Sequence, residues 1–322
     1  MKQLLITILP IFFFSCAVQE STSTSSHISE TVIRTPQVFL PGLVSEEEST
    51  QFDLVFAPDN RTIYFTRRKG EEKQRIYTAS YSEEQGWSTP ELTSFSTDRD
   101  EYPNLTPDGN TLYFGSERPI EGRPNLGNFD TNVWMNTKSN EGWSTPTPLS
   151  PTINYVQAEG EQWPVSNENH FHTVDGETFY LCTQRPGTAG IDLYQTTKTT
   201  SGFTEPQKLP ATINTEKYWE YAPKLSPDGN YLFFQSYGRP DTQGGDDIYV
   251  SKRGVDGQWQ QALPLGPMIN TGQNECPTGI TWDGNFFFFT RDEPSPEGDY
   301  GGISKIYVIS MEALQLETLF EE

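Results

Sequence analysis

Short apolar runs that flank an Asp-Gly or Asp-Asn turn recur along this chain. Five segments align on one Asp, and they are LVFAPDNRTIYFTRR (54–68), PNLTPDGNTLYFGSERP (103–119), HFHTVDGETFYLCTQRP (170–186), PKLSPDGNYLFFQSYGRP (223–240) and TGITWDGNFFFFTRDEP (278–294). The aromatic and β-branched residues on both sides of the turn have strand composition, and Gly after Asp takes a positive φ at no steric cost. Each segment therefore predicts a β-hairpin.

Each hairpin is followed by two more strand-like stretches. The third strands are QRIYTASY, TNVWMNTK, IDLYQTTK, DDIYVSKR and SKIYVISM, and four units continue into GWSTPEL, GWSTPTPL, GFTEPQKL or GQWQQALPL. Helical periodicity is nearly absent, and only SMEALQLETLFEE at the C-terminus offers a marginal helix or a final strand. Units of four short antiparallel strands in series predict an all-β protein, a β-propeller of four-stranded blades.

The number of blades depends on the two ends of the chain. Five copies of the repeat favour five blades. The segment TPQVFLPGLVS (35–45) is similar to the fourth strands of other units, so it could pair into the last blade and join both chain ends. In the alternative, residues 31–50 and the C-terminal tail form a degenerate sixth blade.

The repeat resembles a known family. The pattern SPDG, LYF, S-x-RP and DIY is similar to the WD40-like repeat of TolB-type propellers, in a lipoprotein context of the kind found in Bacteroidota, and it covers roughly residues 50–310. The resemblance implies the propeller fold. It does not imply one activity, because propellers act as binding proteins, lyases, hydrolases and peptidase domains.

The first 34 residues differ from the rest. One Lys, an apolar run from Leu4 to Phe14 and then Ser15-Cys16 predict a secretory signal at 1–15, too short to span a membrane comfortably. Ser15-Cys16 resembles the lipobox of bacterial lipoproteins, which implies cleavage before Cys16 and a diacylglycerol on its thiol; the alternative is a plain secretory signal with an incidental Cys. Residues 16–34 are predicted to be a flexible tether and 35–322 a single propeller domain. The expected location is therefore the bacterial outer membrane or periplasm, with the lipid as the only attachment to the membrane.

Charge and cysteine content narrow the possible partners. The chain has 44 acidic and 22 basic residues, a net charge of −22, which repels nucleic acid and anionic lipid. Besides Cys16 it has only Cys182 and Cys276, which do not make a disulfide framework, although one bridge between them stays open.

A ring of charged residues is expected at one end of the propeller. In an antiparallel meander the segments after the second strand and before the first strand of each blade lie at the same end. The candidate binding rim, defined as the charged and aromatic residues of these segments, is Arg118, Arg185, Arg239, Arg291, Glu101, Glu161, Trp163, Glu220 and Glu275. These residues either pin the loops through ion pairs or hold an anionic ligand, and Trp163, Tyr102, Tyr218, Trp219 and Tyr221 either pack between blades or stack on sugar rings.

Departures from the repeat point to blades two and three. The spacing between aligned Asp residues is 49, 67, 53 and 55, and the longest interval, from 108 to 175, contains the insertion NYVQAEGEQWPVSNENH. That insertion ends at His170, which aligns with Leu54 and Pro103, while His172 aligns with Leu105 and Leu225. Being two apart, both imidazoles are expected on one side of the strand, with His172 as a packed core residue.

Catalytic and metal signatures are sparse. Oligogalacturonate-lyase-type propellers draw histidines from several blades to a metal, whereas the histidines of this chain outside the tether all lie in the third unit. No catalytic set is therefore assigned; His170, His172 and Arg185 stay candidates, with Glu161 or Glu168 as a further ligand, and no metal site is predicted. The oxygen-rich segments DTQGGDDIY (241–249) and NFDTN (128–132) could hold Ca²⁺, but Asp130, Asp192 and Asp247 are expected instead to bond loop amides.

Two classes of function follow. The first is a non-catalytic, lipid-anchored envelope propeller that binds a protein or a glycan through the rim of blades two and three. The second is a carbohydrate-active enzyme, a lyase or hydrolase of an anionic polysaccharide, that uses the blade-three histidines and the rim arginines. A purely structural adaptor in an envelope complex is a third possibility. On balance the chain is expected not to be an enzyme.

Overall fold

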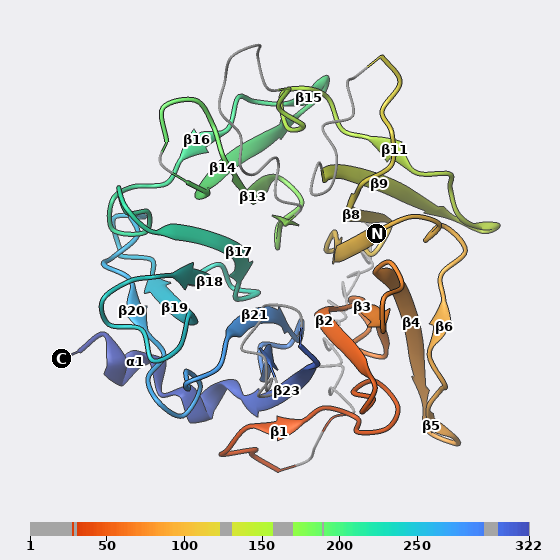
Figure 1. The fold of residues 1–322 in the computed structure, drawn as a ribbon, viewed down its shortest axis with the longest axis horizontal. Helices are drawn as coiled ribbons and strands as arrows, with labels where there is room; N and C mark the ends of the chain where they lie inside the picture. The colour runs from red at the N-terminus through yellow and green to blue at the C-terminus, as the bar shows by residue number, and fades with distance from the viewer. Residues whose placement is uncertain are drawn as a thin grey trace, which may run out of the picture.

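The computed structural model describes Ile28 and residues 31–122, 131–156, 170–188, 190–292 and 302–321. In these ranges the chain forms five small antiparallel sheets arranged around a central axis (Figure 1). The predicted all-β fold with five four-stranded blades is confirmed. The six-bladed alternative is wrong, because the N-terminal strand pairs into the fifth sheet instead of starting a sixth.

Each blade runs outward from the axis, strand by strand. The innermost strands are β2 (Ser49–Phe56), β7 (Asp100–Leu105), β12 (Phe171–His172), β17 (Trp219–Leu225) and β21 (Glu275–Ile280). The second strands are β3 (Thr62–Lys69), β8 (Thr111–Ser116), β13 (Thr178–Thr183), β18 (Tyr231–Tyr237) and β22 (Phe286–Asp292). The third strands are β4 (Arg75–Ser82), β9 (Asn132–Ser139), β14 (Asp192–Thr199), β19 (Asp246–Lys252) and β23 (Ser304–Ser310).

The outermost position varies between blades. In the first three blades the fourth strand is broken into two short pieces, and these are β5 (Gly86–Trp87) and β6 (Glu91–Leu92), β10 (Gly142–Trp143) and β11 (Thr147–Pro148), and β15 (Gly202–Phe203) and β16 (Gln207–Lys208). Blade 4 has only β20 (Leu263–Pro264), and in blade 5 the outermost strand is β1 (Gln37–Val38) from the other end of the chain.

The aligned acids of the repeat fasten the hairpin turns. In blade 4, Asp228 Oδ1 accepts hydrogen bonds from the Asn230 amide at 3.1 Å and from the Ser226 hydroxyl at 2.5 Å. Asp108 makes the equivalent bonds to the Asn110 amide and the Thr106 hydroxyl. These hydrogen bonds hold the local backbone in a turn, so the repeated Asp is explained by structure alone.

Aromatic contacts between neighbouring blades fill the core. Trp143 of blade 2 lies edge-on to Tyr64 of blade 1, and its indole N–H donates to the Tyr64 hydroxyl at 3.3 Å. Trp259 of blade 4 meets Tyr180 of blade 3 in the same way, with ring centroids 6.3 Å apart. Each ring pair buries apolar surface between two sheets and fixes their separation, so the blades stabilise one another.

Both ends of the chain meet in blade 5. Strand β1 pairs antiparallel with β23, Gln37 opposite Val308 and Val38 opposite Tyr307, and the Phe39 amide donates to the Ile306 carbonyl at 2.8 Å. In Figure 1 β1 lies alongside β23, where the red and blue ends of the colour scale meet. The predicted closure of the ring by the N-terminal segment is therefore observed.

The packed part of the chain begins earlier than the sequence suggested. Ile33, which was assigned to the tether, is buried in the core of blades 1 and 5, and its amide donates to the Ser310 hydroxyl at 2.8 Å. The reason is that an isolated apolar residue beside a strand end gains both burial and a hydrogen bond there. The packed chain thus extends at least to Ile33.

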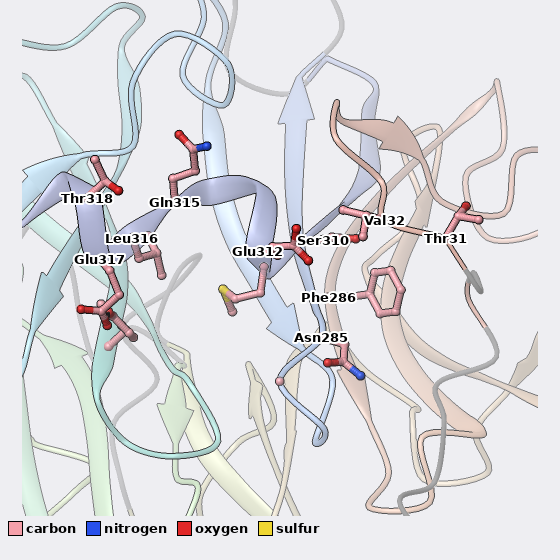
Figure 2. Close-up of a pocket in the computed structure, with 13 residues that line it drawn as sticks. Thr31, Val32, Asn285, Phe286, Ser310, Glu312, Gln315, Leu316, Glu317 and Thr318 are labelled. Atoms are coloured by element: carbon pink, nitrogen blue, oxygen red, sulfur yellow. Dashed lines mark hydrogen bonds between the residues drawn. The ribbon is translucent and has the colours of Figure 1, made fainter.

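The C-terminal segment ends in a short 3-10 helix η1 (Met311–Leu314) and a helical turn α1 (Leu316–Leu319). Together with Val32 and Phe286 this segment borders a groove of about 550 Å³, in which Figure 2 shows Leu316, Glu317 and Thr318. Glu317 bonds the Tyr231 hydroxyl and the Lys252 amine, and Phe320 stacks near Tyr231. The C-terminal segment thus packs on blade 4 in the way that Trp143 and Trp259 pack on the blade before their own.

We expect the closing strand to carry much of the stability. Phe39 is buried against Phe56 and Phe288, with centroids 6.4 and 5.0 Å away. Phe39→Ala should lower the free energy of unfolding by about 3–5 kcal/mol, because it leaves a cavity at the seam where the first and last strands pair. Urea unfolding measures this loss, and Val255→Ala, at a fully exposed position, is the matched control. A loss for Phe39→Ala equal to that of the control would contradict the expectation.

Candidate functional site

The predicted rim arginines lie together at one end of the propeller, but each has partners in its own blade. Arg118 contacts Asp100, Arg239 contacts Glu220, and Arg291 contacts Glu275, in each case at 2.8 Å. Each guanidinium also donates to a main-chain carbonyl of the preceding loop at 2.6 Å, and these carbonyls belong to Phe95, Ile213 and Ile269. The three pairs therefore pin the loop before each inner strand to the end of the second strand.

Burial shifts the pKa values of the three paired acids. Desolvation is the largest influence on Glu220 and Glu275 and raises the pKa of both above the ordinary value, while the paired arginines act in the opposite direction. The pKa of Asp100 is raised for the same reason. Acids held in this way are parts of the scaffold, and the ionised pair offers little to an incoming anion.

Two other rim residues have different partners. Arg185 donates to the carbonyls of Thr152 and Ile153 at 3.1 and 3.2 Å and lies 3.8 Å from Glu205, an exposed acid on the outer strand. Glu101 is buried, contacts Arg99 at 3.2 Å, and has a pKa that burial raises to about 7. Glu161, Glu168 and Trp163 lie outside the described residues, as does Cys16.

The channel brings together buried ionisable side chains from three blades. We define the channel cluster as Asp53 of β2, His170, His172 of β12 and Lys224 of β17. His170 Nε2 lies 3.6 Å from Asp53 Oδ1, and its ring packs on Tyr102 with centroids 3.7 Å apart. Asp53 is 1% exposed and His170 3%. The histidines therefore face the axis, on one side of their strand, while Phe171 between them packs into the core.

A backbone bulge brings Asp53 to this position. In β2 the pairing with β3 skips Asp53, and its φ is +52°. Tyr102 and Ala222 occupy equivalent bulges in β7 and β17, with φ of +58° and +53°. Left-handed backbone at non-glycine residues costs about 1–2 kcal/mol each, so the surrounding ring must impose it.

His172 is not at the core position that the sequence alignment gave it. In the other blades the residue three before the turn Asp pairs with the one four after it, as Leu105 does with Leu112. His172 pairs instead with Tyr180, five after Asp175. A slip of one residue turns a side chain to the opposite face of the sheet, so His172 takes the channel position that Asn104 and Lys224 have in their blades.

The slip has a visible cause. In blades 2 and 4 the amide of the residue before the turn donates to the main chain across the hairpin, as Thr106 does to Thr111. The Thr173 amide instead donates to the side-chain oxygen of Asn104 at 3.4 Å, and Asn104 Nδ2 donates to His172 Nδ1. A side chain from the neighbouring blade thus replaces one hydrogen bond of the hairpin. The alignment predicted that His172 packs at an apolar core position, and this position is wrong. The ring faces the channel instead, where it is largely enclosed.

The channel is a closed and largely neutral interior. The pKa of His170 and of His172 is well below the ordinary value, mainly because burial disfavours the imidazolium and then because Lys224 is near. Burial raises the pKa of Asp53 to about 8, against the opposing influence of Lys224. The contact between His170 and Asp53 therefore joins two neutral groups below about pH 8, despite its ion-pair geometry.

The cavity that the described channel residues enclose is small. A cavity of about 20 Å³ lies among Asn104, His172, Lys224 and Thr278, which is room for about one water molecule. Gln51, Asp53 and Thr278 carry buried polar atoms without a hydrogen-bond partner in the part of the chain that is described. Such atoms are ordinarily satisfied by ordered water, and the volume admits no sugar ring.

The structure brings no metal-binding cluster together among the described residues, where no group of three or more His, Cys, Asp or Glu has a suitable arrangement. Asp247 accepts from the Gln243 and Gly244 amides at 2.7 and 3.1 Å, which is the loop-bonding role expected for it. Asp192 contacts Lys208 at 2.8 Å instead. Asp130 lies outside the described residues, and Cys182 and Cys276 are both free thiols rather than a disulfide.

The sequence did not single out Asp53, Lys224 or Asn104. Asp53 and Lys224 lie in inner strands, and the equivalent positions of the other blades carry different types of residue. The repeat therefore gives no signal for them. A signal did exist for another set: Asn154, Asn214 and Asn270 recur in the motif Ile-Asn, and each bonds the main chain of the third strand in its blade. These residues fix the loops beneath the rim.

Aromatic side chains also lie at the rim end of blade 4. We define the aromatic platform as Tyr218, Trp219 and Tyr237. Trp219 and Tyr237 have ring centroids 6.1 Å apart, and Tyr237 is 41% exposed. Trp219 also packs against Gly190 of blade 3, where a Cβ would collide with its indole ring. Tyr221, in contrast, directs its hydroxyl to Asp246. Of the predicted aromatics, Trp219 thus packs between blades 3 and 4, while stacking on sugar rings stays a prediction.

Comparisons with known proteins support the fold. No protein-family model and no curated protein matches this chain. A solved structure described as a glycoside hydrolase is similar, with a TM-score of 0.52 and 9% identity over 86% of this chain and 92% of that one. Two further similar structures are a putative TolB from Agrobacterium tumefaciens (TM-score 0.49, 15% identity, 82% of this chain and 78% of that one) and TolB from Acinetobacter baumannii (TM-score 0.48, 14% identity, 82% of this chain). This chain spans 55% of the A. baumannii protein. TolB propellers are thus among the structures similar to this chain, and at these identities the likeness concerns the fold.

Among the described residues no helix is both long and apolar enough to cross a bilayer.

Asp53 should make stability depend on pH. Its pKa of about 8 in the folded protein exceeds the value of 3.8 for an unperturbed Asp, so the folded state holds a proton that the unfolded state releases. The free energy of unfolding should therefore fall as the pH rises from about 4 to 8, and by up to about 1.4 kcal/mol per pH unit from this group alone. Glu101 and Asp246, whose pKa values are about 7, add in the same direction.

Asp53→Asn should flatten this slope, because an amide cannot ionise. Urea midpoints of the wild type and the variant between about pH 5 and 8 measure the difference. Asp108→Asn is the control, since its turn hydrogen bonds lower the pKa of Asp108 and keep it ionised in both states across this range. Equal slopes for the wild type and Asp53→Asn would show that Asp53 is solvated.

Proposed function

We propose that the protein is a non-catalytic binding propeller whose ligand is a glycan and whose contact surface includes the aromatic platform. The observation that carries this proposal is the enclosure of the channel cluster. Asp53 and His170 are the side chains best suited to proton transfer, yet they are only 1% and 3% exposed, and the cavity of about 20 Å³ beside His172 and Lys224 does not reach them. A general acid or base must come within about 3 Å of the substrate atom that it protonates, which this geometry does not allow.

The rim supports binding more than chemistry. The guanidinium groups of Arg118, Arg239 and Arg291 are committed to acids and carbonyls, so they add rigidity to the end of the ring. The platform then offers half-exposed aromatic rings on a rigid base, flanked by Lys217, whose ammonium lies 5.0 Å from the Tyr218 ring centroid. Rigid aromatic rings bind the apolar faces of sugars at low entropic cost.

A glycan fits this surface better than a protein partner does. The platform is three rings wide, which matches a few sugar units, whereas a stable protein interface buries about 800 Å² on each side. Polar and charged neighbours beside the rings suit a ligand rich in hydroxyl groups. The rim of blades two and three, which includes Trp163 and Glu161, stays a candidate extension of this surface.

Attachment to the bacterial envelope is part of the proposal. The run from Leu4 to Phe14 followed by Ser15-Cys16 supports a lipoprotein signal, and the diacylglycerol on Cys16 would hold the propeller at the outer membrane or on its periplasmic side. A Ser/Thr-rich stretch after Cys16 would give the propeller reach from the bilayer.

A carbohydrate-active enzyme is the second candidate, and one contact favours it. Asp53, with a pKa of about 8, lies beside a neutral imidazole and could hold a proton for transfer. One structure of similar fold is described as a glycoside hydrolase, at 9% identity. Opening of the channel would be required before Asp53 could meet a substrate.

Affinity electrophoresis through gels that contain single polysaccharides, neutral and anionic, tests the first proposal. Retention by at least one polysaccharide is expected, and Tyr237→Ala should weaken it about tenfold, the loss typical of one aromatic contact at an interface. Leu92→Ala, at an exposed position on β6, is the matched control and should be retained like the wild type. Reducing-end and unsaturated-uronate assays on the same polysaccharides should show no product.

Two results would contradict the proposal. Product formation that Asp53→Asn or His170→Ala abolishes would establish the enzyme instead. Absence of retention by every polysaccharide, together with saturable binding of a purified envelope protein that Tyr237→Ala weakens, would assign the platform to a protein partner.

A further inference from the structure

A second polar cavity lies far from the rim. It occupies the outer part of the gap between blades 3 and 4, at the end of the ring that carries the Asp-Gly turns, and measures about 340 Å³. We call it the outer groove; the side chains used below are Tyr180, Lys208, Arg253 and Trp259. Its volume is within the range of about 300–1,000 Å³ that small-molecule sites have in proteins.

A departure from the repeat opens this groove. In blades 2 and 3 the third strand returns through a short turn, KSNEGW (138–143) and KTTSGF (198–203). Blade 4 has RGVDGQW (253–259), one residue longer between the paired ends, and in it Arg253 and Trp259 form an isolated β-bridge, as Lys138 pairs with Trp143 and Lys198 with Phe203. At the boundary of blades 2 and 3, Phe203 packs on Phe171 and Phe179 with centroids 5.2 Å apart. Arg253 therefore stands where blades 2 and 3 have Lys138 and Lys198, in a hairpin one residue longer than theirs.

Arg253 is held rigidly in this gap. Its guanidinium carbon lies 4.5 Å from the Trp259 ring centroid, and its Nη2 donates to the Tyr180 hydroxyl at 2.7 Å. Stacking and one hydrogen bond fix the plane of the guanidinium group and leave most of its N–H donors unused. Its Nε is buried and has no hydrogen-bond partner among the described residues.

The absence of an acid beside Arg253 is unusual in this protein. The chain has twice as many acidic as basic residues, 44 against 22. The rim arginines each have a carboxylate within 4 Å, whereas Arg253 has none among the residues that the structure describes. Asp175 borders the groove, but its Oδ1 is bound to the Glu177 and Thr178 amides of its own turn. A guanidinium group that is held in place without a carboxylate of the protein beside it is suited to bind the carboxylate of a ligand.

We propose that the outer groove binds a small, polar molecule through a carboxylate that Arg253 holds, with the Tyr180 hydroxyl orienting the guanidinium. Lys208 also borders the groove, but its amine is paired with Asp192 at 2.8 Å, so Arg253 supplies the positive charge. A sugar acid and an acidic amino acid share this chemistry. The site is independent of the aromatic platform, so either can fail without the other.

Isothermal titration of the folded protein with D-glucuronate, L-glutamate and neutral D-glucose tests the assignment. At least one of the two acids should bind saturably, and D-glucose should not. Arg253→Gln should weaken the binding of that acid about tenfold or more, the loss of roughly 1.4 kcal/mol expected for one charge-assisted contact, while Arg253→Lys should restore part of it. Binding of only D-glucuronate identifies a sugar acid, and binding of only L-glutamate identifies an amino acid.

Lys138→Gln is the matched control, because the Lys138 ammonium also lies over a tryptophan, 5.8 Å from the Trp143 ring centroid, at the boundary of blades 1 and 2 and away from the outer groove. It should bind like the wild type. Urea unfolding of each variant confirms that the fold is retained. Failure of both acids to bind at millimolar concentration, equal binding of D-glucose, or unchanged binding by folded Arg253→Gln would each overturn the proposal.

Discussion

The pairing of β1 with β23 is the interaction on which the remaining structure depends. It joins residues 37–38 to 307–308 and turns an open row of five sheets into a ring. A row would leave the edge of β23 unpaired and would expose to water the faces of the first and last blades that meet in the ring. Closure instead forces five inner strands against one axis, where little volume remains. A Cβ at Gly279 would collide with the carbonyl oxygen of Leu54, which shows how closely the first and last inner strands approach.

This crowding decides the chemistry of the channel. Side chains of five strands fill the axis, so ionisable groups that face it lose water and shift toward their neutral forms. Asp53, His170 and Lys224 therefore behave as interior polar residues rather than as an open active site, although a list of their types would suggest catalysis. The same closure leaves the ends of the ring and the gaps between blades as the surfaces where ligands can bind. Both proposed sites lie there, the aromatic platform at one end and the outer groove near the other.

Much of the architecture follows from sequence because it repeats. The hairpins and the four-stranded blades are encoded by residues that recur in each unit, such as the turn Asp, and the N-terminal closure follows from the similarity of residues 35–45 to the fourth strands. The rim arginines recur as well. The sequence offered ion pairing with an acid of the same blade as one role for them, and Arg118, Arg239 and Arg291 form such pairs.

Features that belong to one blade could not be derived in this way. The slip of β12 depends on Asn104 of another blade, which takes the Thr173 amide, and no alignment on the turn Asp contains that contact. At the positions of Asp53 and Lys224, another blade has Tyr102 and Asn104. The alignment therefore does not predict ionisable side chains in the channel. Their proximity depends on the diameter of the closed ring. Likewise the sequence shows that the blade-4 hairpin is longer, but only the fold shows that Arg253 stacks on Trp259 without an acid beside it.

The enclosure of the channel is the central claim, and the two channel histidines report on it directly. Carbon-detected NMR of histidine-labelled protein, with His170→Gln and His172→Gln to assign the signals, follows each imidazole as the pH changes. Buried neutral rings should show no protonation step between about pH 5 and 7, because their pKa values lie well below the ordinary one and Asp53, with a pKa of about 8, ionises above this range. Titration of either ring with a midpoint near 6.5 would mean that water and protons reach the channel freely, and would contradict the account of a closed, non-catalytic propeller.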